Sequence, residues 1–138
     1  MKTMKIKAVV TGGAGFIGSN LVNFLIDQRI VVTVIDNLVA GKRERVNLQA
    51  KLIVADIRDQ SAITPAFAGA DYVFHLAALP QVQYSIEHPV ETHEVNVTGT
   101  MNVLLAARDA KVKRVIYSAS SSAYGDSLVM PLHEDLPA

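Results

Sequence analysis

Apolar residues in this chain gather in short runs that are separated by stretches of mixed polarity. The runs are rich in Val and Ile, and they lack a strict alternation of apolar and polar positions. This pattern is typical of strands that are buried on both faces of a parallel sheet. The runs predict five strands, at residues 5–11, 31–36, 52–55, 72–76 and 114–117.

Helical spacing occupies the stretches between these runs. Between the first two, Ile17, Leu21 and Leu25 recur every four residues, with Phe24 beside them. A longer helix is predicted over residues 90–109, because apolar positions there recur on one face. That face carries Val97, Met101, Leu104 and Leu105.

Residues 60–67 predict a short helix that breaks near Thr64, because Pro65 in a helix interior costs about 3 kcal/mol. The alternation of strands and helices predicts βαβ units, right-handed crossovers and a parallel sheet. We therefore expect one α/β domain over residues 1–138, with a doubly wound sheet of five strands in the order 3-2-1-4-5.

Composition and charge narrow the functional classes. The length of 138 residues is enough for one domain with a hydrophobic core. Lys and Arg together number 13, as do Asp and Glu, and this balance argues against a protein that binds nucleic acid or a membrane surface. The absence of cysteine excludes disulfide scaffolds and thiol catalysis. The 4 histidines show no metal-ligand spacing, so we expect no metal site.

Hydropathy predicts no membrane segment and no secretory signal. The longest apolar run, residues 103–107, falls far short of the ~20 residues that a membrane span needs. The apolar run that follows the N-terminal lysines is too short for the hydrophobic region of a signal peptide. A cytoplasmic protein is therefore expected.

The strongest chemical signal is a glycine-rich segment at residues 11–18, Thr-Gly-Gly-Ala-Gly-Phe-Ile-Gly, here called the glycine loop. It follows the first predicted strand and opens the first helix. Gly12 allows a tight turn, Gly15 lets a pyrophosphate approach the backbone, and Gly18 lets helix and strand pack closely. The helix dipole and the N–H groups at its start favour phosphate there. No Gly-Lys-Ser/Thr follows, so this is not an ATPase-type phosphate loop.

An acidic residue follows at the distance that dinucleotide binding requires. Asp36 ends the second predicted strand, 18 residues beyond Gly18. A carboxylate there accepts hydrogen bonds from a ribose 2′-hydroxyl and repels a 2′-phosphate, which predicts NAD rather than NADP. The alternative is a solvent-exposed aspartate in a turn with Asn37. Without Asp36, the glycine loop alone would be equally consistent with an ordinary tight turn.

Six segments appear in an order that resembles a known family. They are the glycine loop, Asp36-Asn37-Leu38, Asp56-Ile57-Arg58-Asp59, His75-Leu76-Ala77-Ala78, Asn96 to Thr100, and Ser118 to Gly125. Together they resemble the extended short-chain dehydrogenase/reductase superfamily, and within it the NAD-dependent nucleotide-sugar 4-epimerases that act on UDP-glucose or UDP-N-acetylglucosamine. The resemblance implies a Rossmann-like fold. It covers all of this chain but only the N-terminal part of a typical family member.

The resemblance also implies which residues contact the cofactor. The glycine loop would line the pyrophosphate, the residues after the second strand would surround the adenosine ribose, and Asp56 and Ile57 would border the adenine. The residues after the fourth strand would form the cofactor floor, for which simple core packing is the alternative. Asn96 would stabilise the active-site backbone or the cofactor region. The candidate residues are Gly12, Gly15, Phe16, Ile17, Gly18, Asp36, Asn37, Gly41, Asp56, Ile57, Leu76, Ala77, Ala78 and Asn96.

Hydroxyl side chains cluster after the last predicted strand, where ligands bind in such sheets. The resemblance implies that Ser120 is the catalytic serine, whose hydroxyl would bond the substrate oxygen as it becomes a carbonyl; a polar turn is the alternative. The family's base is the tyrosine of a Tyr-x-x-x-Lys pair. None of the 4 tyrosines in this chain has a lysine four residues later. The chain is therefore expected to be inactive alone and to lack the substrate domain.

Our first hypothesis is the NAD-binding portion of a nucleotide-sugar 4-epimerase, an isomerase that removes the C4 hydride, lets the keto sugar rotate and returns the hydride. A non-catalytic NAD-binding or self-associating module is the alternative. A fragment of a 4,6-dehydratase or decarboxylase is the third, but those enzymes carry an acid where Ser121 or Ser122 stands here. The expected partners are a UDP-sugar and further copies of the chain, because residues 115–117 would form an open sheet edge.

Overall fold

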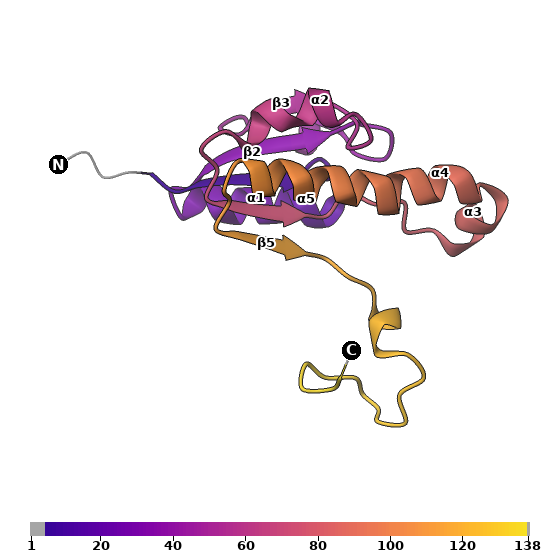
Figure 1. Ribbon diagram of the computed structural model, residues 1–138. Helices are drawn as coiled ribbons and strands as arrows, with labels where there is room; N and C mark the ends of the chain where they lie inside the picture. The colour runs from indigo at the N-terminus through magenta and orange to yellow at the C-terminus, as the bar shows by residue number, and fades with distance from the viewer. Residues whose placement is uncertain (1–4, 138) are drawn as a thin grey trace.

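The computed structural model describes residues 5–137 and contains a parallel sheet of five strands in the order β3-β2-β1-β4-β5 (Figure 1). The predicted α/β doubly wound fold and strand order are confirmed. Three predicted strands begin or end one or two residues away from the observed bounds. The strands are β1 Lys7–Thr11, β2 Val31–Asp36, β3 Lys51–Val54, β4 Tyr72–His75 and β5 Arg114–Tyr117.

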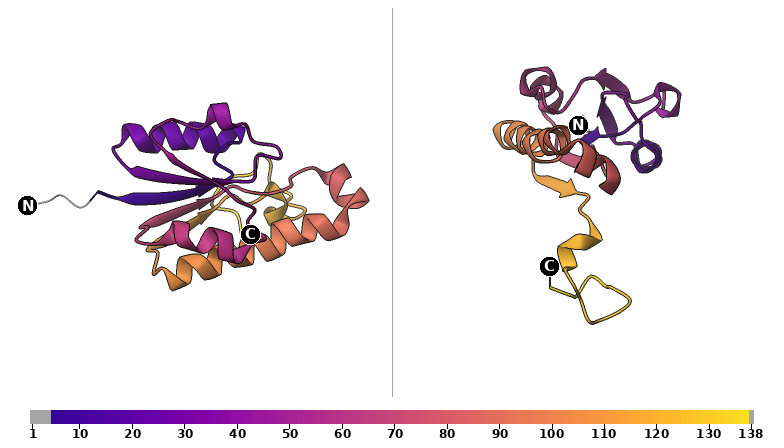
Figure 2. Two further views of the ribbon diagram at one scale, coloured as in Figure 1. Left: turned by 90° about the horizontal axis from the view of Figure 1, so that it is seen from above. Right: turned by 90° about the vertical axis from the view of Figure 1, so that its right-hand side faces the viewer.

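Helices cover both faces of the sheet, so the domain has three layers (Figure 2). Helix α1, Phe16–Asp27, lies on one face. Helix α2, Gln60–Ile63, and helix α5, Thr100–Asp109, lie together on the other. Because side chains alternate along a strand, β1 contributes Val9 to one core and Ala8 with Val10 to the other.

The predicted break after α2 is present. The chain continues from Ile63 into a 3₁₀ turn, η2, which spans Thr64–Phe67 and carries the proline near its start. The side chain of Asp59 caps α2 by accepting a hydrogen bond of 3.0 Å from the backbone N–H of Ala62. The same segment buries Phe67 completely in the core that it shares with α5.

The predicted long helix runs almost without interruption from residue 89 to residue 109, in three sections. They are α4, Pro89–His93; η3, a π-helical section at Glu94–Gly99; and α5. The short helix α3, Val82–Glu87, precedes them and was missed by the sequence pattern.

The apolar stripe of this helix faces away from the sheet. Val97, Met101 and Leu104 are 53%, 54% and 43% exposed. The inner face carries small and β-branched residues instead, such as Val103 and Ala106. In α1 likewise, Phe24 is exposed while Val22 and Leu25 are buried. The spacing therefore finds both helices. In α1 its stripe includes Leu25, which is buried, and Leu21, which packs against the core, but in the long helix it does not identify the side that packs.

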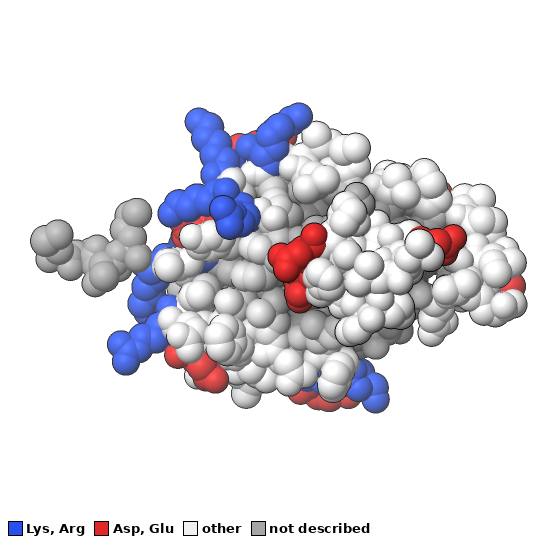
Figure 3. Space-filling view, turned by 90° about the horizontal axis from the view of Figure 1, so that it is seen from below, with Lys and Arg blue, Asp and Glu red and all other residues white. Residues whose placement is uncertain are grey.

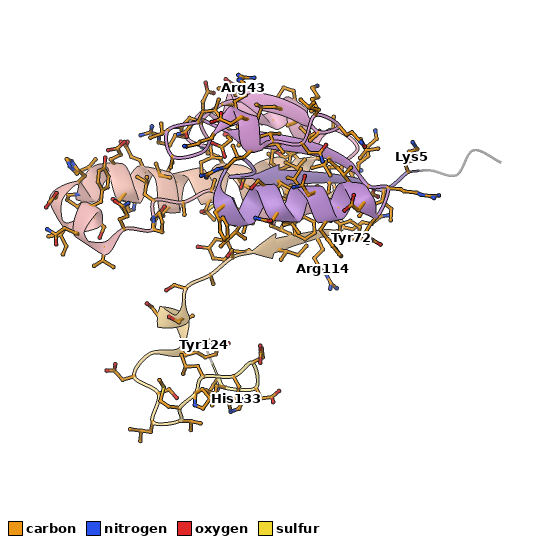
Figure 4. All side chains as sticks on the ribbon, turned by 180° about the vertical axis from the view of Figure 1, so that it is seen from behind. Lys5, Arg43, Tyr72, Arg114, Tyr124 and His133 are labelled. Atoms are coloured by element: carbon orange, nitrogen blue, oxygen red, sulfur yellow. The ribbon has the colours of Figure 1, made fainter. Side chains whose placement is uncertain are left out.

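After β5 the chain leaves the sheet and forms a separate lobe below it (Figures 1 and 2). Tyr124 and His133 lie in this lobe, whereas Tyr72 lies in the sheet, at the start of β4 (Figure 4). β5 was predicted to be buried on both faces, but Ile116 is 40% exposed and Tyr117 57%. Within residues 5–137, no helix has both the length and the apolar character that crossing a bilayer requires.

Candidate functional site

Two adjoining hollows lie beyond the carboxyl ends of the strands, where open parallel sheets bind their ligands. One, the β2 hollow, extends over the ends of β2 and β3 and contains Asp36 and Asp56. The other, the β5 hollow, extends toward the end of β5 and contains Ser120. Both are lined by the same central residues, so they form one cleft. The shared residues are Gly12, Gly15, Leu76, Ala77, Ala78 and Leu79.

The glycine loop leaves no space for a side chain at three of its glycines. At Gly13, a Cβ would lie 2.7 Å from the Cγ1 atom of the buried Val34. Gly12 has φ +71°, and a Cβ on it would lie 2.8 Å from the backbone nitrogen of Ala77. A Cβ on Gly18 would overlap the carbonyl oxygen of Gly12 and lie 2.7 Å from the Cα of Gly13. Gly15 differs, because a Cβ there would meet only the Gly12 oxygen, at 3.3 Å. Gly12, Gly13 and Gly18 are therefore required by packing, whereas Gly15 borders the free space of the cleft.

The first turn of α1 faces the cleft. Gly15 caps the helix without any side-chain hydrogen bond. Phe16 and Ile17 are 77% and 65% exposed and line the β5 hollow, as does Gly18. The start of a twelve-residue helix thus presents backbone N–H groups and its positive dipole end to this cavity.

Asp36 ties the end of β2 to the glycine loop. Its buried carboxylate accepts hydrogen bonds from the backbone N–H groups of Ala14, at 2.9 Å, and Leu38, at 2.8 Å. A Cβ on Gly41 would lie 2.8 Å from Asp36 Oδ1, so the loop after β2 folds tightly over this side chain. A carboxylate offers about four acceptor positions, which leaves capacity for a ligand hydroxyl.

Asp56 is held by a fixed set of partners. Its oxygens accept hydrogen bonds from Arg58 Nε and Nη2, at 2.9 and 2.8 Å, and from Asn37 Nδ2, at 3.0 Å. The hydrogen bond from Arg58 is the main reason why the pKa of Asp56 falls to about 2. Arg58 also lies 3.6 Å from Glu94 and 3.9 Å from Glu91, so it links this loop to the long helix. Sequence reasoning missed the role of Arg58.

Ile57 lies on the border between the core and the β2 hollow. Its side chain is 5% exposed, and a Cβ on Gly99 of η3 would lie 2.6 Å from it. Asn102 in α5 donates hydrogen bonds to the backbone oxygens of Ile57 and Arg58, at 3.0 and 2.9 Å. The long helix therefore fixes the position of the loop that follows β3.

Asn96 in η3 holds the segment after β4 by both atoms of its side-chain amide. Its Nδ2 donates to the carbonyl oxygen of Leu79 at 2.9 Å, and its Oδ1 accepts from the Leu79 N–H at 2.8 Å. Both amide atoms are used on the protein backbone, although Asn96 also lines the β5 hollow. A π-helical section at such a position is common near functional sites.

Ser120 lies at the far end of the β5 hollow. It caps the 3₁₀ turn η4, Ser121–Tyr124, and its hydroxyl is 3.1 Å from Ser122 Oγ and accepts from the Ser122 N–H at 3.2 Å. It is solvent-exposed and shares this hollow with Gly15, Ala77 and Asn96. Among residues 5–137, no three His, Asp or Glu side chains gather as a metal site would require.

Comparison with known proteins agrees with this geometry. Residues 8–138 match the NAD dependent epimerase/dehydratase family. The UDP-glucose 4-epimerase of Lactobacillus helveticus is 37% identical over 134 residues, which are 96% of this chain and 41% of that protein. A UDP-N-acetyl-alpha-D-glucosaminuronate decarboxylase of Bacillus cytotoxicus is 38% identical over 96% of this chain and 41% of its own length.

A solved structure and a further sequence are also similar to this chain. The Thermus thermophilus UDP-glucose 4-epimerase, in complex with NAD, superposes with a TM-score of 0.86 at 36% identity and covers 96% of this chain and 44% of its own. A Klebsiella pneumoniae UDP-glucose 4-epimerase sequence is 36% identical and is matched over 99% of its length. The chain spans about two fifths of the length of most curated relatives that it matches. The predicted superfamily and its dependence on NAD are confirmed: the chain belongs to the NAD dependent epimerase/dehydratase family.

Proposed function

We propose that this chain is the NAD-binding portion of a nucleotide-sugar 4-epimerase. The observation that carries the proposal is one cleft with Asp36 at one end, Ser120 at the other and the glycine loop between them. A dinucleotide has this order of parts, with a ribose that a carboxylate can bind, a pyrophosphate that a helix start can bind, and a reactive ring beyond. The names of related proteins support the sugar chemistry.

The residues of the cleft are suited to NAD. Glycines create a space that a Cβ at Gly15 would enter, and this is where a pyrophosphate would approach the backbone. Asp36 would accept the hydrogen bond of a ribose hydroxyl, and its charge would repel the 2′-phosphate of NADP. Asp56 and Ile57 would border the adenine, with Asn37 and Gly41 near the ribose.

Toward β5, the residues would handle the sugar end. Leu76, Ala77 and Ala78 would form the floor of the cofactor site, and Asn96 would keep that floor in place. Bound NAD would supply the acceptor for the C4 hydride of the sugar. Ser120 would hydrogen-bond the sugar oxygen at that carbon. A hydroxyl is a weak base, so Ser120 requires an activated partner for proton transfer.

Cofactor titration tests the first half of this proposal. Isothermal calorimetry with the whole chain should show NAD binding at least about tenfold tighter than NADP. Asp36→Asn should reduce the ratio of NAD affinity to NADP affinity. Asp27→Asn, at the exposed C-terminal end of α1, should leave this ratio unchanged. Equal affinities of the wild-type chain for NAD and NADP would remove Asp36 from the ribose site.

Turnover assays test the second half. We propose that the chain alone does not interconvert UDP-glucose and UDP-galactose, because none of its tyrosines has a lysine four residues later. Measurable interconversion by the purified chain would overturn this reading. A decarboxylase or dehydratase is the second candidate, since a decarboxylase is among the relatives. The hydroxyls of Ser121 and Ser122, where those enzymes carry an acid, favour the epimerase.

We propose further that the chain self-associates. The apolar stripe of η3 and α5 is exposed, as are Ile116 and Tyr117 on the edge strand β5. Seen from below, most of the surface is uncharged, and Lys and Arg gather at the end near the N-terminus (Figure 3). Light scattering at tens of micromolar tests this proposal, and a monodisperse monomer would refute it.

A further inference from the structure

We propose that His75 is a positioning residue, which as the neutral Nε2–H tautomer locks the wall shared by the two hollows. This inference deepens the proposed NAD site and rests on it for its functional consequence. The wall in question is residues 76–79, which follow β4 and line both hollows. No charged group and no ligand is needed for the lock itself, which is built from side-chain and backbone hydrogen bonds.

His75 is the last residue of β4 and is 1% exposed. Its two ring nitrogens each contact a threonine hydroxyl from a different element. Nδ1 lies 2.6 Å from Thr11 Oγ1 at the end of β1, and Nε2 lies 2.9 Å from Thr100 Oγ1 at the start of α5. The ring therefore connects the central strand to the long helix across the carboxyl edge of the sheet.

The positions of the protons on the His75 ring follow from the hydrogen bond that Thr100 already donates. Thr100 Oγ1 donates its only proton to the carbonyl oxygen of Asn96, at 2.7 Å. It must then accept from His75, so Nε2 carries the ring proton and Nδ1 is bare. The bare Nδ1 accepts the hydroxyl proton of Thr11. Every bond in the chain of donors thus runs in one direction, from β1 to the helix.

Because Thr11 donates its hydroxyl proton to His75, both lone pairs of Thr11 Oγ1 can accept hydrogen bonds from the wall. The oxygen accepts from the backbone N–H groups of Leu76, at 3.2 Å, and Ala77, at 3.3 Å. The far end of the wall is held by Asn96, which bonds both backbone groups of Leu79. His75 connects the two ends of the wall. Its ring bonds Thr11 on one side and Thr100 on the other, and Thr100 in turn donates to the backbone oxygen of Asn96.

Burial supports the neutral form of the ring. Desolvation lowers the pKa of His75 to about 4, so the ring carries no charge at neutral pH. A second proton on Nδ1 would force Thr11 Oγ1 to accept from the ring, so its own proton would occupy one of the two directions from which it now accepts a backbone N–H. The Leu76 N–H would keep its bond of 3.1 Å to the Thr11 carbonyl oxygen, whereas the Ala77 N–H would lose its acceptor. The geometry thus depends on one tautomer of one residue.

The tautomer can be read directly by NMR. Two-bond ¹H–¹⁵N correlation spectra of the ¹⁵N-labelled chain distinguish Nε2–H, Nδ1–H and doubly protonated rings, and His75→Gln identifies the signal. We expect His75 to show the Nε2–H pattern at pH 7 and to keep it down to pH 5.5. An Nδ1–H pattern, or titration of this ring near 6.5, would overturn the proposal.

The clamp is tested by paired threonine variants. Thr11→Val removes the acceptor of the Ala77 N–H, while Thr11→Ser keeps it; Thr33→Val in β2, away from the cleft, is the control. Losing this partly buried hydrogen bond should speed amide exchange at Ala77 by about tenfold and weaken NAD binding to a similar degree. The serine variant and the control should stay within about twofold of wild type.

These readouts separate the two claims. If the wild-type chain shows the expected tautomer and Ala77 protection but does not bind NAD, the proposed function fails and the lock stands. If Thr11→Val folds and exchanges Ala77 at the wild-type rate, the lock is refuted whatever NAD does. Should Thr11→Val not fold, the tautomer pattern in the wild-type chain decides the question.

Discussion

Replacing Gly18 with alanine adds one methyl group where α1 lies against the glycine loop. The new Cβ would overlap the Gly12 carbonyl oxygen and lie 2.7 Å from the Gly13 Cα, both of which are backbone atoms. Gly12 cannot move away easily. Its N–H is bonded to the Ile35 carbonyl at 2.8 Å, and its Cα side is filled by Ala77.

The magnitude follows from two opposing terms. Forcing a methyl group into packed backbone costs about 1–3 kcal/mol, and the overlap here puts Gly18→Ala near the upper end. Alanine gains at most about 1 kcal/mol over glycine from helix propensity, because position 18 lies within α1. We therefore expect a net loss of about 2 kcal/mol in the free energy of unfolding. NAD binding should weaken as well, since the loop must shift.

Gly15→Ala is the matched control, because it adds the same methyl group three residues earlier. Its Cβ would meet only the Gly12 oxygen, at 3.3 Å, and φ there is −75°, which alanine adopts. We expect stability to fall by less than about 1 kcal/mol, the usual loss for alanine at a helix N-cap. NAD affinity should nevertheless fall strongly, because the methyl group enters the cleft.

Urea unfolding followed by circular dichroism, with NAD calorimetry on the same samples, measures both effects. The reasoning is refuted if Gly18→Ala unfolds at the wild-type midpoint, or if Gly15→Ala binds NAD as tightly as wild type. A Gly15→Ala variant that loses as much stability as Gly18→Ala would show that the two glycines do not have separate roles.

Three further predictions concern the polar contacts of the cleft. The pKa of His75 is about 4 folded and 6.5 unfolded, so stability should be complete above pH 6.5 and fall by up to about 3 kcal/mol as the pH drops to 4, in urea titrations of wild type but not of His75→Gln. Asn96→Leu should lower stability by about 2–3 kcal/mol in thermal unfolding, because both backbone groups of Leu79 lose their partners, and Asn96→Asp should lose less. Arg58→Ala should raise the pKa of Asp56 from about 2 toward 3.8 in carboxyl NMR titrations, while Arg45→Ala should not change it.

Much of the fold can be predicted from the sequence because each strand can be identified from its own short segment. A strand buried on both faces is a short run of Val and Ile, and that run requires no knowledge of its neighbours. The glycine loop is equally local, since its spacing, the preceding strand and the following helix are adjacent in the chain. Asp36 extends this to the next strand. The break at Thr64 follows from Pro65 alone.

The buried face of the long helix cannot be predicted in this way. The inner face of α5 uses Val103 and Ala106, which are small enough to lie close to the sheet, while larger side chains such as Met101 remain outside. Ranked by hydrophobicity alone, Met101 would be expected to be more buried than Ala106, but the reverse is observed. The partners of Asn96 were also out of reach, because Leu79 is 17 residues away and only the folded chain brings them together.

The cleft is built so that ligand contact and loop geometry depend on the same side chains. Asp36 is the proposed partner of a ribose hydroxyl, yet its carboxylate already accepts hydrogen bonds from the N–H groups of Ala14 and Leu38. Asp56 borders the same hollow while it is bonded to Arg58 and Asn37. A substitution at either aspartate therefore changes the wall as well as the contact, and a loss of NAD affinity in one variant cannot be assigned to the missing contact alone. Neutral replacements that keep one acceptor oxygen are the variants that separate the two effects.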